Sequence, residues 1–77
     1  MLVGVYSFFD RLTQSYGEPF VAVKKEVAQR RFNYVMSQSP MVSADMQLFQ
    51  LGVLDLDTGV ITPSVEFVCN YEVVKDE

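Results

Sequence analysis

The triplet Asp57-Thr58-Gly59 is the string in this chain that most closely matches a catalytic motif. Aspartic proteases carry such a triplet, and in them two carboxylates share a proton and activate water, with half-size chains working as dimers. Here Val60 follows the triplet where those enzymes have a small Ala or Ser, and 77 residues are few for a protease protomer. We interpret the triplet as the tip of a hairpin, in which Gly59 takes the positive φ angle that such loops commonly need.

Other catalytic and metal-binding arrangements are incomplete. Asp55-x-Asp57-x-Gly59 resembles part of a calcium loop, but a third acid and a later glutamate are missing. The chain has no histidine, so Cys69 and the serines lack an imidazole base. We therefore expect no catalytic residue, no metal site, no cofactor and no enzymatic activity, and we expect Cys69 to lie in the core.

The basic residues gather in one segment. Four of the six are Lys24, Lys25, Arg30 and Arg31, so the segment 24–31 carries a charge of +3 and the remainder −7. Phosphate neutralisation by these side chains, with Tyr34 nearby for stacking, would make a single-strand nucleic-acid site. The alternative is a solvated helix flank attracted to carboxylates elsewhere on the surface, and Arg11 is a further basic residue that could join either arrangement.

Length and composition indicate one small globular domain spanning residues 1–77. A chain this short buries roughly 60% of the surface that it exposes when unfolded, so another source of stability is expected. Cys69 is the only cysteine, which excludes an intramolecular disulfide and fits a reducing compartment. Self-association is the remaining candidate for this additional source of stability. We see no secretory signal and no run of roughly 20 apolar residues, so we expect no membrane contact.

Hydrophobic patterning predicts the order strand, helix, strand, strand, strand. The expected strands cover residues 2–9, 46–54, 60–62 and 65–73, and the expected helix covers 21–37. The fold class is therefore α+β, with a mostly antiparallel four-stranded sheet and one helix packed on one face. Gly52 inside a strand suggests a bulge or a close backbone approach. Strict alternation in the last strand predicts a single core face, made of Val65, Phe67, Cys69, Tyr71 and Val73.

One helix is too narrow to cover four strands. Four strands about 4.8 Å apart span roughly 15 to 20 Å, whereas a helix with its side chains is about 10 to 12 Å across. We expect the uncovered apolar residues, with Tyr6 and Phe8 among them, to form a face for a partner or a second copy.

Two ordered segments resemble a known family. They are Val5-Tyr6-Ser7-Phe8-Phe9-Asp10-Arg11 with Tyr16-Gly17-Glu18-Pro19-Phe20, and Leu48-Phe49-Gln50-Leu51-Gly52-Val53-Leu54-Asp55 with Thr58-Gly59. In this order, around a central basic helix, they resemble the small nonstructural protein of microviruses, most closely that of gokushovirus-type phages. The likeness covers roughly residues 2 to 62.

The resemblance implies a nonstructural protein of the infected bacterium's cytoplasm that is often labelled DNA-binding. By analogy with protein C of related phages, its role would lie in single-stranded genome synthesis and packaging. The hypothesis from sequence is a self-associating, non-enzymatic protein of that kind, in which the basic helix contacts any DNA. The alternative is an adaptor that binds a procapsid or replication protein through its uncovered sheet face, with no DNA contact.

Overall fold

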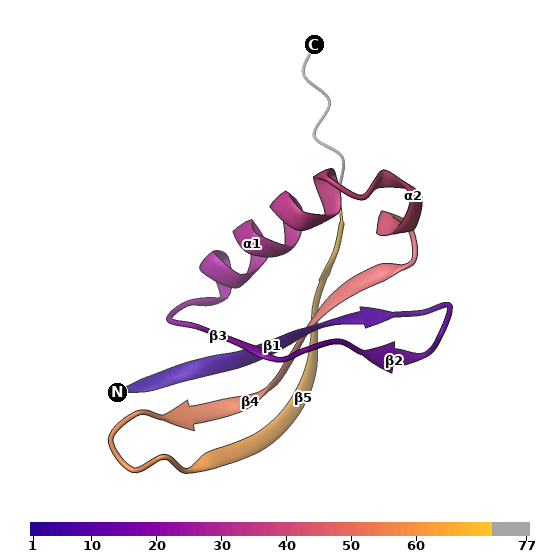
Figure 1. The fold of residues 1–77 in the computed structure, drawn as a ribbon. Coiled ribbons are helices and arrows are strands. Elements are labelled where there is room, and N and C mark those ends of the chain that lie inside the picture. Colours follow the sequence, from indigo (N-terminus) through magenta and orange to yellow (C-terminus); the bar gives the residue numbers. More distant parts are fainter. Residues whose placement is uncertain (72–77) are drawn as a thin grey trace.

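The computed structural model describes residues 1–71 and confirms the α+β class (Figure 1). All strand pairs in its sheet are antiparallel, and one main helix lies against the sheet. The predicted residues 72 and 73 of the last strand, and the tail after them, lie outside the described residues. The elements are β1 (Leu2–Asp10), β2 (Ser15–Tyr16), β3 (Phe20–Ala22), α1 (Lys25–Ser37), α2 (Pro40–Ser43), β4 (Met46–Asp55) and β5 (Ile61–Asn70).

Strand β1 is paired along both of its edges. One edge pairs with β4 over its whole length, and the other pairs first with β3 and then with β2. Gly17 closes the gap between β2 and β3, because its N–H donates to the Phe8 carbonyl and its own carbonyl accepts a bond from the Ser7 hydroxyl. β2 and β3 together therefore act as one interrupted edge strand, and the sheet is effectively four strands wide.

Strands β4 and β5 form the hairpin expected from the sequence. Gly59 has a φ of 79° in the connecting turn, which confirms the predicted positive angle. The strand register shifts between Gln50 and Gly52, so the predicted irregularity at Gly52 is also confirmed. The expected strands 60–62 and 65–73 are, in the described residues, one continuous strand. Pro63 is accommodated within it because β5 lies at the edge of the sheet.

Helix α1 begins four residues later than predicted. Lys24 is its extended N-cap residue, and Val21 lies in β3, where it pairs with Val5. The sequence pattern assigned Val21 to the helix because its spacing fits the apolar stripe, but pairing with β1 holds this segment extended. Within α1 the predicted stripe is correct, since Ala28, Phe32 and Met36 are buried. The one-turn helix α2 falls in a segment predicted as loop.

The core lies between α1 and one face of the sheet. Phe32 and Leu48 are fully buried at its centre, and Phe32 packs edge-on against Phe8 at 5.2 Å between ring centroids. The sheet side of this core includes Tyr6, which is only 3% exposed. The expectation that Tyr6 and Phe8 form the uncovered face is therefore wrong: both lie under the helix and its neighbouring strand.

The single core face predicted for the last strand is also wrong. Cys69 and Tyr71 pack against the core, but Val65 and Phe67 are 62% and 53% exposed. The cause is a second register shift, since Leu48 pairs with Cys69 while the adjacent Phe49 pairs with Phe67. The extra residue moves the alternation by one position, so the two halves of β5 direct their apolar side chains to opposite faces.

Candidate functional site

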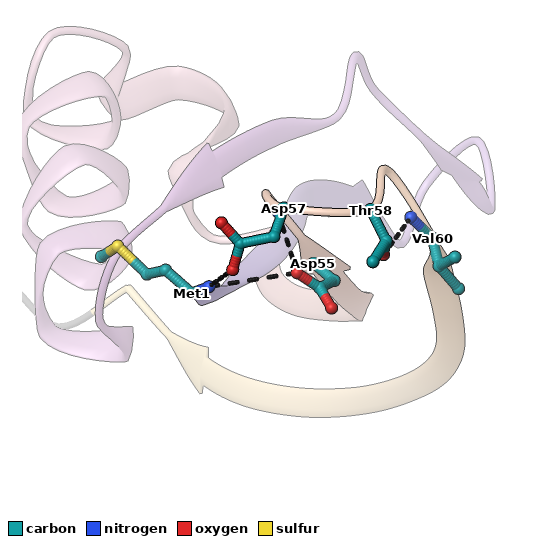
Figure 2. A network of polar contacts seen from close by, with 5 residues as sticks. All are labelled: Met1, Asp55, Asp57, Thr58 and Val60. Carbon is teal, nitrogen blue, oxygen red and sulfur yellow. Dashed lines mark hydrogen bonds and ion pairs between the residues drawn. The ribbon is translucent and has the colours of Figure 1, made fainter.

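Asp57 lies in an exposed turn and is engaged in structural contacts (Figure 2). Its carboxylate pairs with the terminal ammonium of Met1, which also lies 3.9 Å from the Asp55 carboxylate. The Asp57 N–H donates to Asp55 Oδ1 at 2.9 Å, and the Thr58 hydroxyl accepts from the Val60 N–H. These contacts are those of an Asx-type turn that fixes the hairpin, as the sequence predicted. Asp57 is 78% exposed, whereas a shared-proton dyad needs two carboxylates held together.

The structure places all four predicted basic residues at α1 and leaves all four exposed. At 100° per residue, Lys24, Arg30 and Arg31 fall within one arc of about 120° around the helix, whereas Lys25 lies outside that arc, about 100° beyond Lys24. Three of the four cations therefore share one flank and Lys25 does not. We define the basic stripe by its helical spacing as Lys24, Val27, Arg30, Arg31 and Tyr34.

The basic stripe contains two exposed apolar side chains between its cations. Val27 is 38% exposed and Tyr34 is 68% exposed. The spacing of residues 27, 30, 31 and 34 is that of one continuous helical surface. A cationic flank that also exposes an aromatic ring can neutralise a phosphate and offer a stacking surface to a base.

Arg31 is anchored to the sheet. Its guanidinium carbon lies 4.4 Å from the centroid of the Phe20 ring, which belongs to β3. Phe20 in turn packs against Tyr6 and Phe8 in the core. A guanidinium stacked by its face keeps its N–H edges available for hydrogen bonds, so the stacking fixes the position of this donor group without consuming its donors.

Within residues 1–71, no carboxylate forms an ion pair with a cation of the basic stripe. In the described residues, the ion pairs join only the terminal ammonium of Met1 to Asp55 and Asp57. Glu26 lies four residues before Arg30 on α1, yet no ion pair forms between them. Glu66 likewise pairs with no basic side chain. Arg11 lies apart from the stripe, because its guanidinium donates to the Ala44 carbonyl at 2.7 Å.

A second feature is the side of the sheet opposite α1. Three aromatic rings surround that of Phe49 there: its centroid lies 5.4, 5.5 and 5.7 Å from those of Phe9, Tyr16 and Phe67. Tyr16 is 45% exposed and Phe67 is 53% exposed. We call this surface, which Val65 extends along β5, the helix-free face. The sequence could not place Phe9, Tyr16 and Phe49 on this face, because it does not show which side of the sheet the helix covers.

The described strands place no charged side chain on the helix-free face. By strand register, Asp10 and Glu66 lie on the same side of the sheet as Tyr6 and therefore face away from it. Asp55 also lies on that opposite side, since it pairs with Leu2. Across the described strands, no Lys, Arg, Asp or Glu side chain falls on the aromatic side.

The surroundings of Tyr6 perturb the pKa of its hydroxyl. Burial raises the pKa of its hydroxyl above the ordinary value, and the negative charge of Glu26 raises it further. The phenol is therefore held neutral beneath α1. It packs over Gly4, where an added Cβ would lie 2.5 Å from the ring.

Two open pockets lie at the edges of the sheet. One, of about 290 Å³, is lined by Gln29, Asn33, Cys69 and Asn70. The other, of about 470 Å³, lies at the hairpin and is lined mainly by apolar side chains and threonines. Among residues 1–71, no group of three His, Cys, Asp or Glu side chains is placed to hold a metal ion. Within the same range, no helix is long and apolar enough to cross a bilayer.

The fold and surface define a small antiparallel α+β domain with one exposed basic helix flank and one uncharged aromatic sheet face. Comparison with known protein families matches residues 3–74 to the family described as Phage ORF5 protein. The chain belongs to this family and is a bacteriophage protein. The match includes all of β5, most of which lies beyond the resemblance noted in the sequence. No curated protein and no solved structure matches the chain.

Proposed function

We propose that this phage protein is a non-enzymatic nucleic-acid-binding protein that serves single-stranded genome synthesis or packaging in the host cytoplasm, as its likeness to the gokushovirus nonstructural protein implies. The observation that carries the proposal is the basic stripe on α1. Its cations are exposed, they stand outside every ion pair of the described residues, and Arg31 is held in place by Phe20.

Single-stranded DNA suits this surface better than a duplex. The stripe offers about three cations and one exposed ring, which matches a short length of backbone with one stacked base. The remainder of the chain carries a charge of −7, which would repel the extended phosphate array of a duplex. Binding confined to one helix flank should be weak and steeply salt-dependent.

The test is binding of the purified protein to a fluorescent single-stranded oligonucleotide, followed by anisotropy across a salt series. We expect the double variant Lys24→Ala/Arg30→Ala to weaken binding and to reduce the slope of log K against log salt by about 1.4, or about 0.7 per lost contact. Lys25→Ala is the matched control, because it removes a charge from the same helix outside the stripe.

Two results would contradict the proposal. One is absence of binding by the wild type at low salt. The other is an equal loss per removed charge in Lys25→Ala and in the double variant, since that would report net charge rather than a defined surface.

A second candidate function is supported by the helix-free face. Its exposed rings and lack of charge are features of protein interfaces, whose centres are enriched in aromatics and depleted of charged residues. In this alternative the protein is an adaptor for a procapsid or replication protein and makes no DNA contact. If the wild type binds DNA and the double variant Lys24→Ala/Arg30→Ala does not, the adaptor alternative is excluded. Absence of DNA binding by the wild type would favour the adaptor.

A further inference from the structure

The helix-free face exposes adjoining apolar side chains to water. Val65 and Phe67 of β5 and Tyr16 of β2 are each 45% exposed or more, and they surround the more buried Phe49. Exposed aromatic and aliphatic side chains that adjoin in this way mark a surface that is covered in the working protein. We infer that a second copy of this chain covers the helix-free face, so that two sheets pack face to face with their α1 helices on the outside.

Charge favours a second copy over a nucleic acid at this face. Binding of a strand needs cations beside the stacking rings. The described strands place no cation there, and the rings contact one another edge-on, as at 5.7 Å between Phe49 and Phe67. Because the chain carries a charge of −4, two copies repel each other over most of their surface. The uncharged face is where they can approach without bringing carboxylates together.

The size of the face is sufficient for a dimer. β1 has nine residues, and β4 and β5 have ten each. At about 3.3 Å per residue and about 4.8 Å between strands, a four-strand face measures roughly 30 by 19 Å. Two such faces in contact would bury roughly 1,100 Å² in total, just below the roughly 1,200 to 2,000 Å² of standard interfaces but above the roughly 1,000 Å² that a specific interface should clear.

The arrangement of the rings suits a two-fold interface. Phe49 lies on the central strand β4 and contacts rings from β1, β2 and β5. In a two-fold dimer the same patch meets itself, so a central aromatic group flanked by uncharged side chains is self-complementary. A second sheet would also supply the additional burial that a domain of this size requires. This inference does not depend on DNA binding, because α1 lies on the other side of the sheet.

Sedimentation equilibrium over a wide protein concentration range tests the inference. We expect the wild type to be dimeric, and we expect Phe67→Glu and Val65→Glu each to raise the dimer dissociation constant by at least about 100-fold, since each would place a carboxylate in an apolar interface. Both side chains are more than half exposed in the protomer, so the substitutions leave its core intact. Met41→Glu, at a site on α2 that is 94% exposed, is the matched control and should remain dimeric.

Three outcomes would overturn the inference. A wild type that is monomeric at every concentration would leave the helix-free face to a different protein. Dimers that resist both glutamate variants would place the interface elsewhere. Small-angle X-ray scattering of the wild type that fits an elongated edge-to-edge dimer, and excludes a compact sandwich, would show pairing through β5. Sedimentation and small-angle scattering of the wild type both use unmodified protein, so these two measurements decide the question even if a glutamate variant fails to fold.

Discussion

The guanidinium of Arg31 lies 4.4 Å above the ring of Phe20 and joins the exposed flank of α1 to the edge strand β3. Phe20 also contacts the rings of Tyr6 and Phe8, at 6.0 and 5.5 Å between centroids. Arg31 is thus the point at which the basic stripe is connected to the core. The stability of the domain and the position of one cation of the stripe consequently depend on the same contact.

Replacing Arg31 by Ala should lower the free energy of unfolding by about 0.5 to 1 kcal/mol, the value of an exposed cation–π contact. Urea unfolding followed by circular dichroism measures the change. Arg30→Ala is the control, because this substitution removes the same charge from the neighbouring exposed position, where no ring lies beneath the guanidinium. The unfolding midpoint of Arg30→Ala should stay close to that of the wild type. Equal losses in the two variants would show that the Phe20 contact does not contribute to stability.

Gly52 is the glycine at which backbone strands approach most closely. A Cβ added there would lie 2.5 Å from the Thr62 carbonyl oxygen and 3.3 Å from the Pro63 Cα, both in the backbone of β5. The clash between an added Cβ and the β5 backbone can be relieved only if β4 and β5 move apart. Gly52→Ala should therefore destabilise the protein by about 2 kcal/mol or more. Thermal unfolding at a fixed protein concentration gives the measurement.

Gly17→Ala is the matched control for Gly52. At Gly17 an added Cβ meets only the Phe8 carbonyl oxygen at 3.7 Å, an ordinary contact, and the φ angle is not positive. The alanine should therefore leave stability unchanged or raise it by up to about 1 kcal/mol through the unfolded chain. A Gly52→Ala protein as stable as Gly17→Ala would contradict the close approach of β4 to β5.

Local sequence patterns predicted the helices and strands better than they predicted which side of each strand faces the core. The helical stripe at Ala28, Phe32 and Met36 and the positive φ of Gly59 follow from the identities of nearby residues, and both are confirmed. The start of α1 was misplaced because Val21 fits a helical period, whereas its pairing with Val5, 16 residues away, is a tertiary contact.

The faces of the sheet could not be read from alternation alone. β1 is apolar on both sides, so nothing in its own residues shows that α1 covers Tyr6 rather than Phe9. In β5, one register shift near Val68 reverses the alternation, and a bulge of this kind has no signature in the sequence. The basic residues were found by type, but the sequence could not show that their cations stand outside the ion pairs formed within residues 1–71.

Tyr6 predicts a specific dependence of stability on alkaline pH. Burial, with a smaller contribution from Glu26, raises the pKa of its hydroxyl in the folded state above the unfolded value of about 10. Below pH 10 the phenol is neutral in both states, so its contribution to stability is fully present. As the pH rises further, the unfolded Tyr6 ionises while the folded one stays neutral, and this contribution is lost progressively until the pH passes the folded pKa.

Urea unfolding of the wild type and Tyr6→Phe between pH 8 and about 11.5 measures this effect. The wild type should lose more stability than Tyr6→Phe above pH 10, because the variant has no hydroxyl to ionise at that position. Tyr34→Phe is the control: Tyr34 is 68% exposed, and its variant should follow the wild-type curve throughout. The wild type and Tyr6→Phe differ only in this hydroxyl, so the difference between their two curves reports the ionisation of the Tyr6 phenol. Parallel curves for these two proteins would mean that water reaches the Tyr6 hydroxyl and that α1 does not seal this end of the core.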